Sequence, residues 1–138
     1  MSLLQIRHLA KSYGGVKAVD DVSLSVNKGE VVSIIGPNGA GKTTYFNLLT
    51  GQLAPTFGEV SLRGKNINAL PPHDRAKLGM GRTFQIVKPL IALSALENVM
   101  VGAFLGHARM ADARDRAMAV LNRVGLGALA KRRAGDLT

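Results

Sequence analysis

Apolar and polar side chains alternate along residues 3–9 and 16–26 with the two-residue period of β-strands. Residues 3–9 predict one strand and residues 16–26 predict a second. Residues 11–15 contain the glycines and polar side chains of a turn, and residues 27–29 predict a tight turn after the second strand. We therefore expect two antiparallel strands at the start of the chain.

A short apolar run then changes the pattern. Residues 31–35 are mostly β-branched and predict a buried strand, and a glycine-rich stretch follows them. The sequence continues as a helix through residues 45–49, and Gly51 stands where a left-handed residue would end that helix. This order predicts a strand, a glycine loop and a helix in succession.

The next segments are short and separated by turn residues. Residues 59–62 predict a strand, and residues 63–66 turn it back into a hairpin. The proline pair that begins residues 71–78 favours a short helix closed by a glycine. We expect a strand over residues 81–85 and an irregular segment over residues 86–90, where a proline opposes a helix.

Two helices are predicted in the last third of the chain. Ser94 and Glu97 have the spacing of a capping box, so a helix should begin at Ser94. A second helix is predicted over residues 110–124. Its expected inward residues are Met118, Leu121 and Val124.

Composition limits the classes of protein that the chain can belong to. Its 138 residues, 46% hydrophobic and 20% charged, fit one globular domain of modest size. The absence of cysteine excludes disulfides and thiolate metal sites, and no apolar run approaches the length of a membrane span. The net charge of +9 favours nucleic acid as a partner, but aromatic residues are only 4% and the basic residues are scattered. We therefore expect no nucleic-acid partner.

The glycine-rich stretch matches the pattern G-x-x-x-x-G-K-[ST] between a predicted strand and a predicted helix. Glycines allow successive backbone N–H groups to face one anion, and the helix N-terminus adds a favourable dipole. Lys42 would place its charge between the terminal phosphates, and the Thr43 hydroxyl would bind Mg²⁺. The motif predicts a nucleoside triphosphate site made of Gly36, Pro37, Asn38, Gly39, Ala40, Gly41, Lys42, Thr43 and Thr44.

Tyr13 is the aromatic residue of the predicted first turn. Its ring could stack on a nucleotide base, a contact worth about 1–3 kcal/mol. It could equally be an ordinary half-buried tyrosine of a turn, and the residues alone leave both interpretations open.

Together these elements resemble the ATP-binding subunit of ABC transporters over nearly the whole chain. The resemblance rests on the phosphate loop over residues 36–44, on Tyr13 upstream and on Thr83-Phe84-Gln85 downstream. It implies an α/β fold of the P-loop NTPase class and ABC-ATPase type, with an antiparallel β subdomain, a phosphate-loop strand-helix core and the start of a helical subdomain. It also implies that Tyr13 stacks on adenine and that Lys42 and Gln85 are catalytic. In that family the glutamine reaches the Mg²⁺ ion and the attacking water, and its loop touches the transmembrane partner.

A narrower resemblance is to the ATPases of branched-chain amino acid importers. It rests on residues 51–58 and on residues 82–85 followed by residues 96–102. It implies ATP-driven import with a second ATPase subunit, membrane permease subunits and, indirectly, a periplasmic binding protein. It also implies a peripheral position on the cytoplasmic face of the inner membrane.

The chain departs from the family's pattern at its end. Residues 137–138 stand where the family's signature loop would begin, and no apolar run ends in Asp-Glu. We therefore expect residues 1–138 to be the amino-terminal part of one ATP-binding domain, able to bind nucleotide at most. Residues 1–88 would be the nucleotide-binding core with its β subdomain, and residues 89–138 the start of the helical subdomain.

Two other functions agree with the same residues. One is a non-transport ABC ATPase that acts on nucleic acid or ribosomes, which the basic charge favours slightly. The other is a module that binds nucleotide without hydrolysing it. A GTPase or nucleotide kinase fits less well, because the sequence contains no Asn-Lys-x-Asp base-reading motif.

Overall fold

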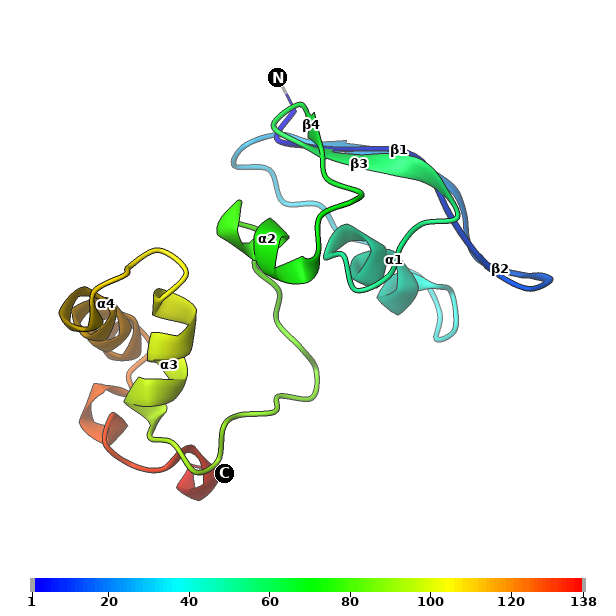
Figure 1. Ribbon diagram of the computed structural model, residues 1–138. Helices are drawn as coiled ribbons and strands as arrows, with labels where there is room; N and C mark the ends of the chain where they lie inside the picture. Colours follow the sequence, from blue (N-terminus) through cyan, green and yellow to red (C-terminus); the bar gives the residue numbers. More distant parts are fainter. Residues whose placement is uncertain (1, 138) are drawn as a thin grey trace. The chain divides into compact units, whose positions relative to one another are not determined.

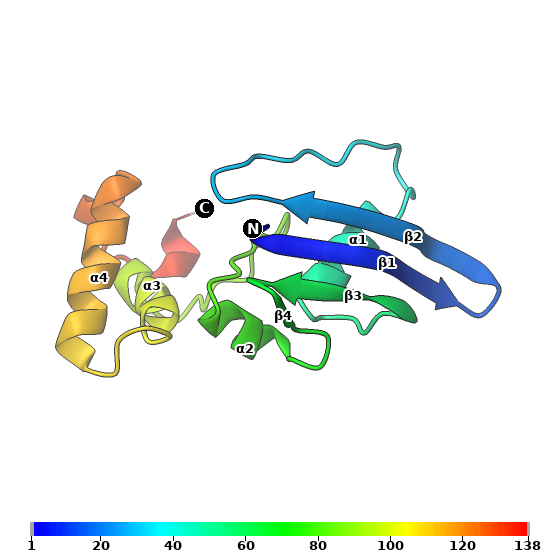
Figure 2. The same cartoon turned by 90° about the horizontal axis from the view of Figure 1, so that it is seen from above.

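The computed structural model describes residues 2–137, which form two compact units that divide between Arg82 and Thr83. The strands of the first unit are β1 (Leu4–Tyr13), β2 (Val16–Val26), β3 (Phe57–Leu62) and β4 (Lys65–Asn66). Its helices are α1 (Lys42–Leu49) and α2 (Pro72–Lys77). The second unit contains the helices α3 (Ala95–Ala103) and α4 (Met110–Arg123), followed by short 3-10 helices at Gly127–Leu129 and Ala134–Asp136. Figures 1 and 2 show these elements from two directions.

The first unit is built on an antiparallel sheet with the strand order β2-β1-β3-β4 (Figure 2). The predicted strands over residues 3–9 and 16–26 are confirmed. The first strand extends further than predicted, to Tyr13, which faces Val16 across the hairpin. The turn is therefore only Gly14-Gly15, where Gly14 has a φ of 57°. Glycine suits position 14 because other residues adopt a positive φ at this first turn position only at a cost.

The core of the first unit lies between one face of the sheet and α1 (Figure 1). Val60 and Leu62 of β3 point to this face with the two-residue period of a strand, whereas a register shift in β1 places Ile6 and Leu9 on it three residues apart. The helix contributes Tyr45, Leu48 and Leu49, so its buried residues recur at helical spacing. The buried side chains that join them are Ile6, Leu9, Val19, Val60, Leu62 and Ile67.

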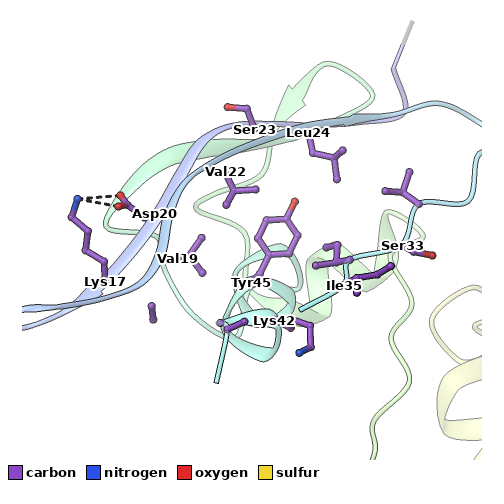
Figure 3. Close-up of a pocket in the computed structure, with 15 residues that line it drawn as sticks. Lys17, Val19, Asp20, Val22, Ser23, Leu24, Ser33, Ile35, Lys42 and Tyr45 are labelled. Atoms are coloured by element: carbon purple, nitrogen blue, oxygen red, sulfur yellow. Dashed lines mark hydrogen bonds and ion pairs between the residues drawn. The ribbon is translucent and has the colours of Figure 1, made fainter. Parts of the chain in front are cut away.

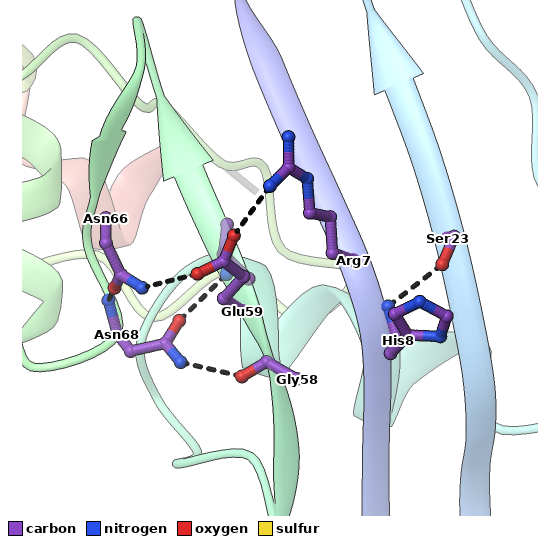
Figure 4. Close-up of polar contacts among 8 residues, drawn as sticks. Arg7, His8, Ser23, Gly58, Glu59, Asn66 and Asn68 are labelled. Carbon is purple, nitrogen blue, oxygen red and sulfur yellow. Dashed lines mark hydrogen bonds and ion pairs between the residues drawn. The ribbon is translucent and has the colours of Figure 1, made fainter.

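Polar side chains on β1, β3 and the segment after β4 join neighbouring chain segments (Figure 4). Glu59 lies 3.6 Å from Arg7 on β1 and accepts a hydrogen bond from Asn66 on β4. The side chain of Asn68 accepts a 2.8 Å hydrogen bond from the Val60 N–H and donates one of 2.9 Å to the Gly58 carbonyl. Asn68 thus extends the pairing of β3 where β4 has ended.

Two predicted strands are wrong. Residues 31–35 are irregular, with Val31 92% and Ile35 93% exposed, and residues 81–85 are irregular as well. The physical reason is pairing: a strand needs a neighbour for its backbone N–H and C=O groups, and none of the strands described pairs with either segment. The hairpin of β3 and β4, the short helix α2 and the irregular segment over residues 86–90 are confirmed.

In the second unit, the capping box predicted at Ser94 is confirmed. The Ser94 hydroxyl accepts a hydrogen bond from the Glu97 N–H, and the Glu97 carboxylate accepts one from the Ser94 N–H. Helix α3 begins at the next residue. Satisfying these otherwise unpaired groups fixes where the helix starts.

Helix α4 is confirmed, but its buried face is not the predicted one. Leu121 is buried as expected, whereas Met118 and Val124 are exposed. The buried stripe is Ala113, Ala117 and Leu121, at a regular spacing of four. Two alanines at this position allow α4 to pack closely against α3, whereas hydrophobicity alone favours the larger side chains.

Within residues 2–137, no helix combines the length and the apolar character that crossing a bilayer requires.

Candidate functional site

The glycine-rich loop adopts the backbone conformation that its sequence suggests. Gly39 and Gly41 have φ values of 84° and 83°, in the left-handed region that favours glycine. At Gly41 there is a second requirement, because a Cβ atom would collide with the Ala18 carbonyl oxygen on β2. The loop is therefore pressed against the hairpin at the residue that precedes α1.

The N-terminus of α1 is free of the protein's own capping groups. Gly41 is the N-cap residue, it offers no side chain to the first N–H groups, and the first turn contains no acidic residue. The positive end of the helix dipole therefore faces the loop without a compensating anion. Thr43, in this first turn, is exposed. Such an end is suited to bind an anion from outside the chain.

Lys42, the first residue of α1, folds back over the loop. Its Nζ donates hydrogen bonds to the carbonyl oxygens of Gly36 at 2.5 Å and Pro37 at 2.6 Å. Both acceptors belong to the predicted phosphate loop. The ammonium group is thus held across the loop by neutral carbonyls, which a polyanion could replace.

A cavity of about 560 Å³ lies beside the loop, and Figure 3 shows the side chains around it. Of the predicted nucleotide-binding residues, Ala40, Gly41 and Lys42 line it. Its other walls are mainly apolar and come from β2, residues 32–35 and Tyr45. The Tyr45 ring rises from α1 toward the sheet, and its hydroxyl is buried with no hydrogen-bond partner among residues 2–137. Burial raises the pKa of this hydroxyl.

The lining of this cavity suits apolar side chains better than a triphosphate. Its lining includes the charged side chains of Lys17, Asp20 and Lys42, whereas the uncapped amides of α1 lie at the loop. The loop and the uncapped start of α1 are therefore better suited to an anion than this cavity is, and the phosphate site at the loop stays a prediction.

Tyr13 ends β1 and is 49% exposed. The Lys11 ammonium lies 5.3 Å from the centre of its ring. This separation is within the range of a cation–π contact. Lys11 is itself held by a 2.8 Å hydrogen bond to the Ala54 carbonyl. Tyr13 does not line the cavity, and adenine stacking on its ring stays a prediction.

Gln85 belongs to the second unit and lies exposed in an irregular segment. Its contact with metal and water stays a prediction. Further along the segment, Asn98 of α3 fixes the chain at Leu90: the Leu90 N–H donates to the Asn98 side chain at 2.8 Å, and that side chain donates to the Leu90 carbonyl at 3.1 Å.

Sequence reasoning missed two arginines that hold the opposite end of α1. Arg75, 1% exposed, donates to the carbonyls of Leu48 at 2.8 Å and Leu49 at 2.7 Å. Arg82 donates to the side chain of Asn47 at 2.6 Å. Burial lowers the pKa of Arg75. The sequence indicates these contacts only indirectly. The last turn of α1 contains no basic residue of its own, so a cation that interacts with its carbonyls has to come from elsewhere in the chain.

The fold and the loop together define a class. An antiparallel sheet packed on a helix, a glycine-rich loop at the uncapped start of that helix and a following helical unit are the features of a P-loop nucleotide-binding protein of the ATP-binding cassette type. The sequence model of the family described as ABC transporter matches residues 19–138, and the chain belongs to this family.

Relatives and solved structures agree with this assignment. The chain is 40% identical to the high-affinity branched-chain amino acid transport ATP-binding protein LivG of Salmonella typhimurium, over 98% of this chain and 59% of the relative. It is 48% identical to the corresponding protein BraF of Pseudomonas aeruginosa, over 72% of this chain and 39% of the relative.

Among solved structures, it is similar to an ATP-binding cassette of an ABC transporter in its ADP conformation, with 34% identity, a TM-score of 0.84 and coverage of 100% of this chain and 59% of that one. A dimeric post-hydrolysis state of a cassette bound to ADP and Pi matches with 29% identity and a TM-score of 0.81, over 98% of this chain and 63% of that one. The predicted fold class is therefore confirmed. The chain spans about three fifths of the length of the LivG relative, 59%.

Proposed function

We propose that this chain is the ATP-binding part of an ATPase subunit that couples ATP binding and hydrolysis to membrane transport. The observation that carries the proposal is the left-handed glycine loop in front of the uncapped start of α1, with Lys42 held over it. The names of the relatives support import of branched-chain amino acids as the transport process.

In this proposal the backbone amides of residues 36–44 hold the phosphates and Lys42 exchanges its carbonyl partners for phosphate oxygens. Thr43 and Gln85 hold Mg²⁺, and Tyr13 stacks on adenine. The residues fit the metal, because a hydroxyl and an amide oxygen are hard donors, both are exposed, and Mg²⁺ binds through few protein ligands plus phosphate oxygens. When bound, the ion neutralises charge that develops on the transferred phosphoryl group.

The proposal includes partners outside this chain. A second ATPase subunit is supported by the dimeric state of a similar cassette, and permease subunits follow from the transport names of the relatives. A periplasmic binding protein would deliver the cargo, and the subunit would lie at the cytoplasmic face of the membrane. Residues 1–88 would serve as the nucleotide-binding core, and residues 89–138 would begin the helical subdomain.

For the 138-residue chain itself we expect nucleotide binding without steady turnover. Its sequence has no apolar run ending in Asp-Glu, so the carboxylates that would hold the metal water and act as base are not among these residues.

Calorimetry with ATP tests the proposal directly. Lys42→Ala should weaken ATP binding at least about tenfold, because a charge-assisted contact to phosphate is lost. Lys28→Ala removes the same charge from an exposed turn of the same unit and should leave the affinity unchanged. Absence of ATP binding by the wild-type chain, or equal affinity of Lys42→Ala and wild type, would contradict the assignment.

A further inference from the structure

The last turn of α1 is held by side chains from two later parts of the chain. The helix contributes no basic residue there, although its negative dipole end favours a cation. Arg75 binds the backbone carbonyls of this turn. Arg82 instead binds side-chain oxygens: its NH1 nitrogen lies 2.6 Å from Asn47 Oδ1, 3.1 Å from Thr50 Oγ1 and 3.3 Å from Gln52 Oε1.

The acceptors of Arg82 are themselves fixed. The Thr50 hydroxyl donates a 2.8 Å hydrogen bond to the Phe46 carbonyl. The Asn47 carbonyl accepts the N–H groups of Gln52 at 2.9 Å and Leu53 at 3.2 Å. A guanidinium placed among such acceptors is anchored to the helix, since its planar fork leaves little freedom to reorient.

Arg82 directly precedes the segment that contains Gln85, so its anchor restrains the start of that segment. Arg82 is the last residue of the first unit. The three peptide steps of extended chain that lead from it to Gln85 span at most about 11 Å. The segment that follows has no secondary structure to order it until α3. At its far end it is fixed by Asn98, which holds Leu90 through two hydrogen bonds. Residues 83–90 are therefore a strap attached at both ends.

We propose that Arg82 is a positioning residue that ties the beginning of the Gln85 segment to the helix of the phosphate loop. Helix α1 then carries Thr43 in its first turn and, through Asn47 and Arg82, holds the start of the strap that contains Gln85. Precise placement of metal-binding groups requires such support from ordered elements. The proposal rests on the proposed function for the role of Gln85, but the anchor itself exists without nucleotide.

Hydrogen–deuterium exchange of the nucleotide-free chain tests the anchor. Arg82→Ala should accelerate exchange of the hydrogen-bonded amides of residues 50–53 about tenfold, because the end of α1 loses the side chain that ties it to the start of the strap, while the β1–β2 hairpin stays protected. Asn47→Ala should act similarly, and the double variant should add little to either single change. Arg82→Lys should restore part of the protection. Arg7→Ala, which removes an exposed arginine of the same unit, is the matched control.

Unchanged exchange of residues 50–53 in Arg82→Ala would overturn the proposal, as would acceleration spread equally over these residues and the hairpin. Additive effects of Arg82→Ala and Asn47→Ala would also overturn it, because the two side chains would then act independently.

Titration with ATP in the presence and absence of Mg²⁺ supplies a second readout. Arg82→Ala should reduce the gain in affinity that Mg²⁺ gives while leaving the Mg²⁺-free affinity intact, as Gln85→Ala should. An equal loss with and without Mg²⁺ would show a purely structural role and overturn the positioning assignment. If the wild-type chain bound no ATP, the proposed function would fail, and the exchange experiment would still decide whether Arg82 anchors the strap.

Discussion

Replacing Arg75 by methionine tests whether a buried guanidinium holds the first unit together. Arg75 donates hydrogen bonds to the carbonyls of Leu48 and Leu49 at the end of α1, of Leu70 at 2.9 Å and of Asn68 at 3.1 Å. One side chain thus joins α1, α2 and the segment between β4 and α2. Methionine keeps an apolar stem of similar length but donates nothing.

The size of the effect follows from the acceptors that remain behind. All four carbonyls lose the contact that Arg75 supplied, but the Leu48 carbonyl keeps a hydrogen bond from the Gly51 N–H, so three are left without a partner among residues 2–137. A buried acceptor without a partner costs about 1–1.5 kcal/mol, and the partly buried carbonyls of Leu70 and Asn68 cost somewhat less than that of Leu49, which gives about 3 kcal/mol for the three. Because burying the charge of a guanidinium is itself unfavourable, removing it offsets part of this loss, and we expect a net destabilisation of about 2–3 kcal/mol.

Two further substitutions at the same position separate the contributions. Arg75→Ala also removes packed methylene groups and should cost about 3–5 kcal/mol. Arg75→Lys keeps a charge and some donors but lacks the planar fork that reaches acceptors on both sides, so a loss of about 1–2 kcal/mol is expected. The order alanine, methionine, lysine therefore distinguishes loss of packing from loss of hydrogen bonds.

Urea unfolding followed by tyrosine fluorescence is a suitable assay. Both tyrosines of the chain, Tyr13 and Tyr45, lie in the first unit, so their signal reports on that unit. Arg63→Ala is the control, because this exposed arginine makes a single long hydrogen bond of 3.4 Å to Leu78. Its loss should cost less than about 0.5 kcal/mol. A stability of Arg75→Met within about 0.5 kcal/mol of wild type would refute the reasoning.

Three further outcomes are expected. Gly41→Ala should abolish ATP binding and destabilise the first unit by about 1–3 kcal/mol, whereas Gly29→Ala, with the same left-handed φ but open space, should cost only about 1 kcal/mol and bind ATP normally. Hydrogen bonds from Ser94 lower the pKa of Glu97, so its contribution to stability is present above the ordinary value of about 4.3 and is lost as the pH falls through the lowered pKa. The unfolding temperature of Glu97→Gln should therefore be lower than that of the wild type at pH 7, and the two temperatures should converge in acid. Ile35→Lys should reduce concentration-dependent association in sedimentation, because an exposed β-branched segment invites pairing between chains; a wild-type chain that is monomeric and unfolds sharply would contradict this.

Elements whose signals are local could be predicted from the sequence. The hairpin of β1 and β2 follows from the alternation of side chains and from Gly14-Gly15, and α3 follows from the capping box. The loop before α1 follows from its glycines, whose left-handed conformations are found where the motif requires them. In each case the determining contacts join residues close in sequence.

The predictions that were wrong concern features set by contacts between residues far apart in the sequence. Residues 31–35 have strand-forming side chains, but a strand exists only when another segment pairs with it, and local composition does not supply one. The buried face of α4 differs from the predicted one because close packing on α3 selects Ala117 over Met118. Arg75 gives no local signal, since its buried acceptors, the carbonyls of Leu48 and Leu49, lie far back along the chain in α1.

The two hydrogen bonds from Lys42 to loop carbonyls also affect how an anion can bind at the loop. The ammonium group already donates hydrogen bonds to Gly36 and Pro37. Binding an anion therefore stabilises it only by the difference in free energy between the new contacts and those that they replace. An anion that binds at the loop therefore has to displace these two carbonyls before it can accept hydrogen bonds from the Lys42 ammonium group.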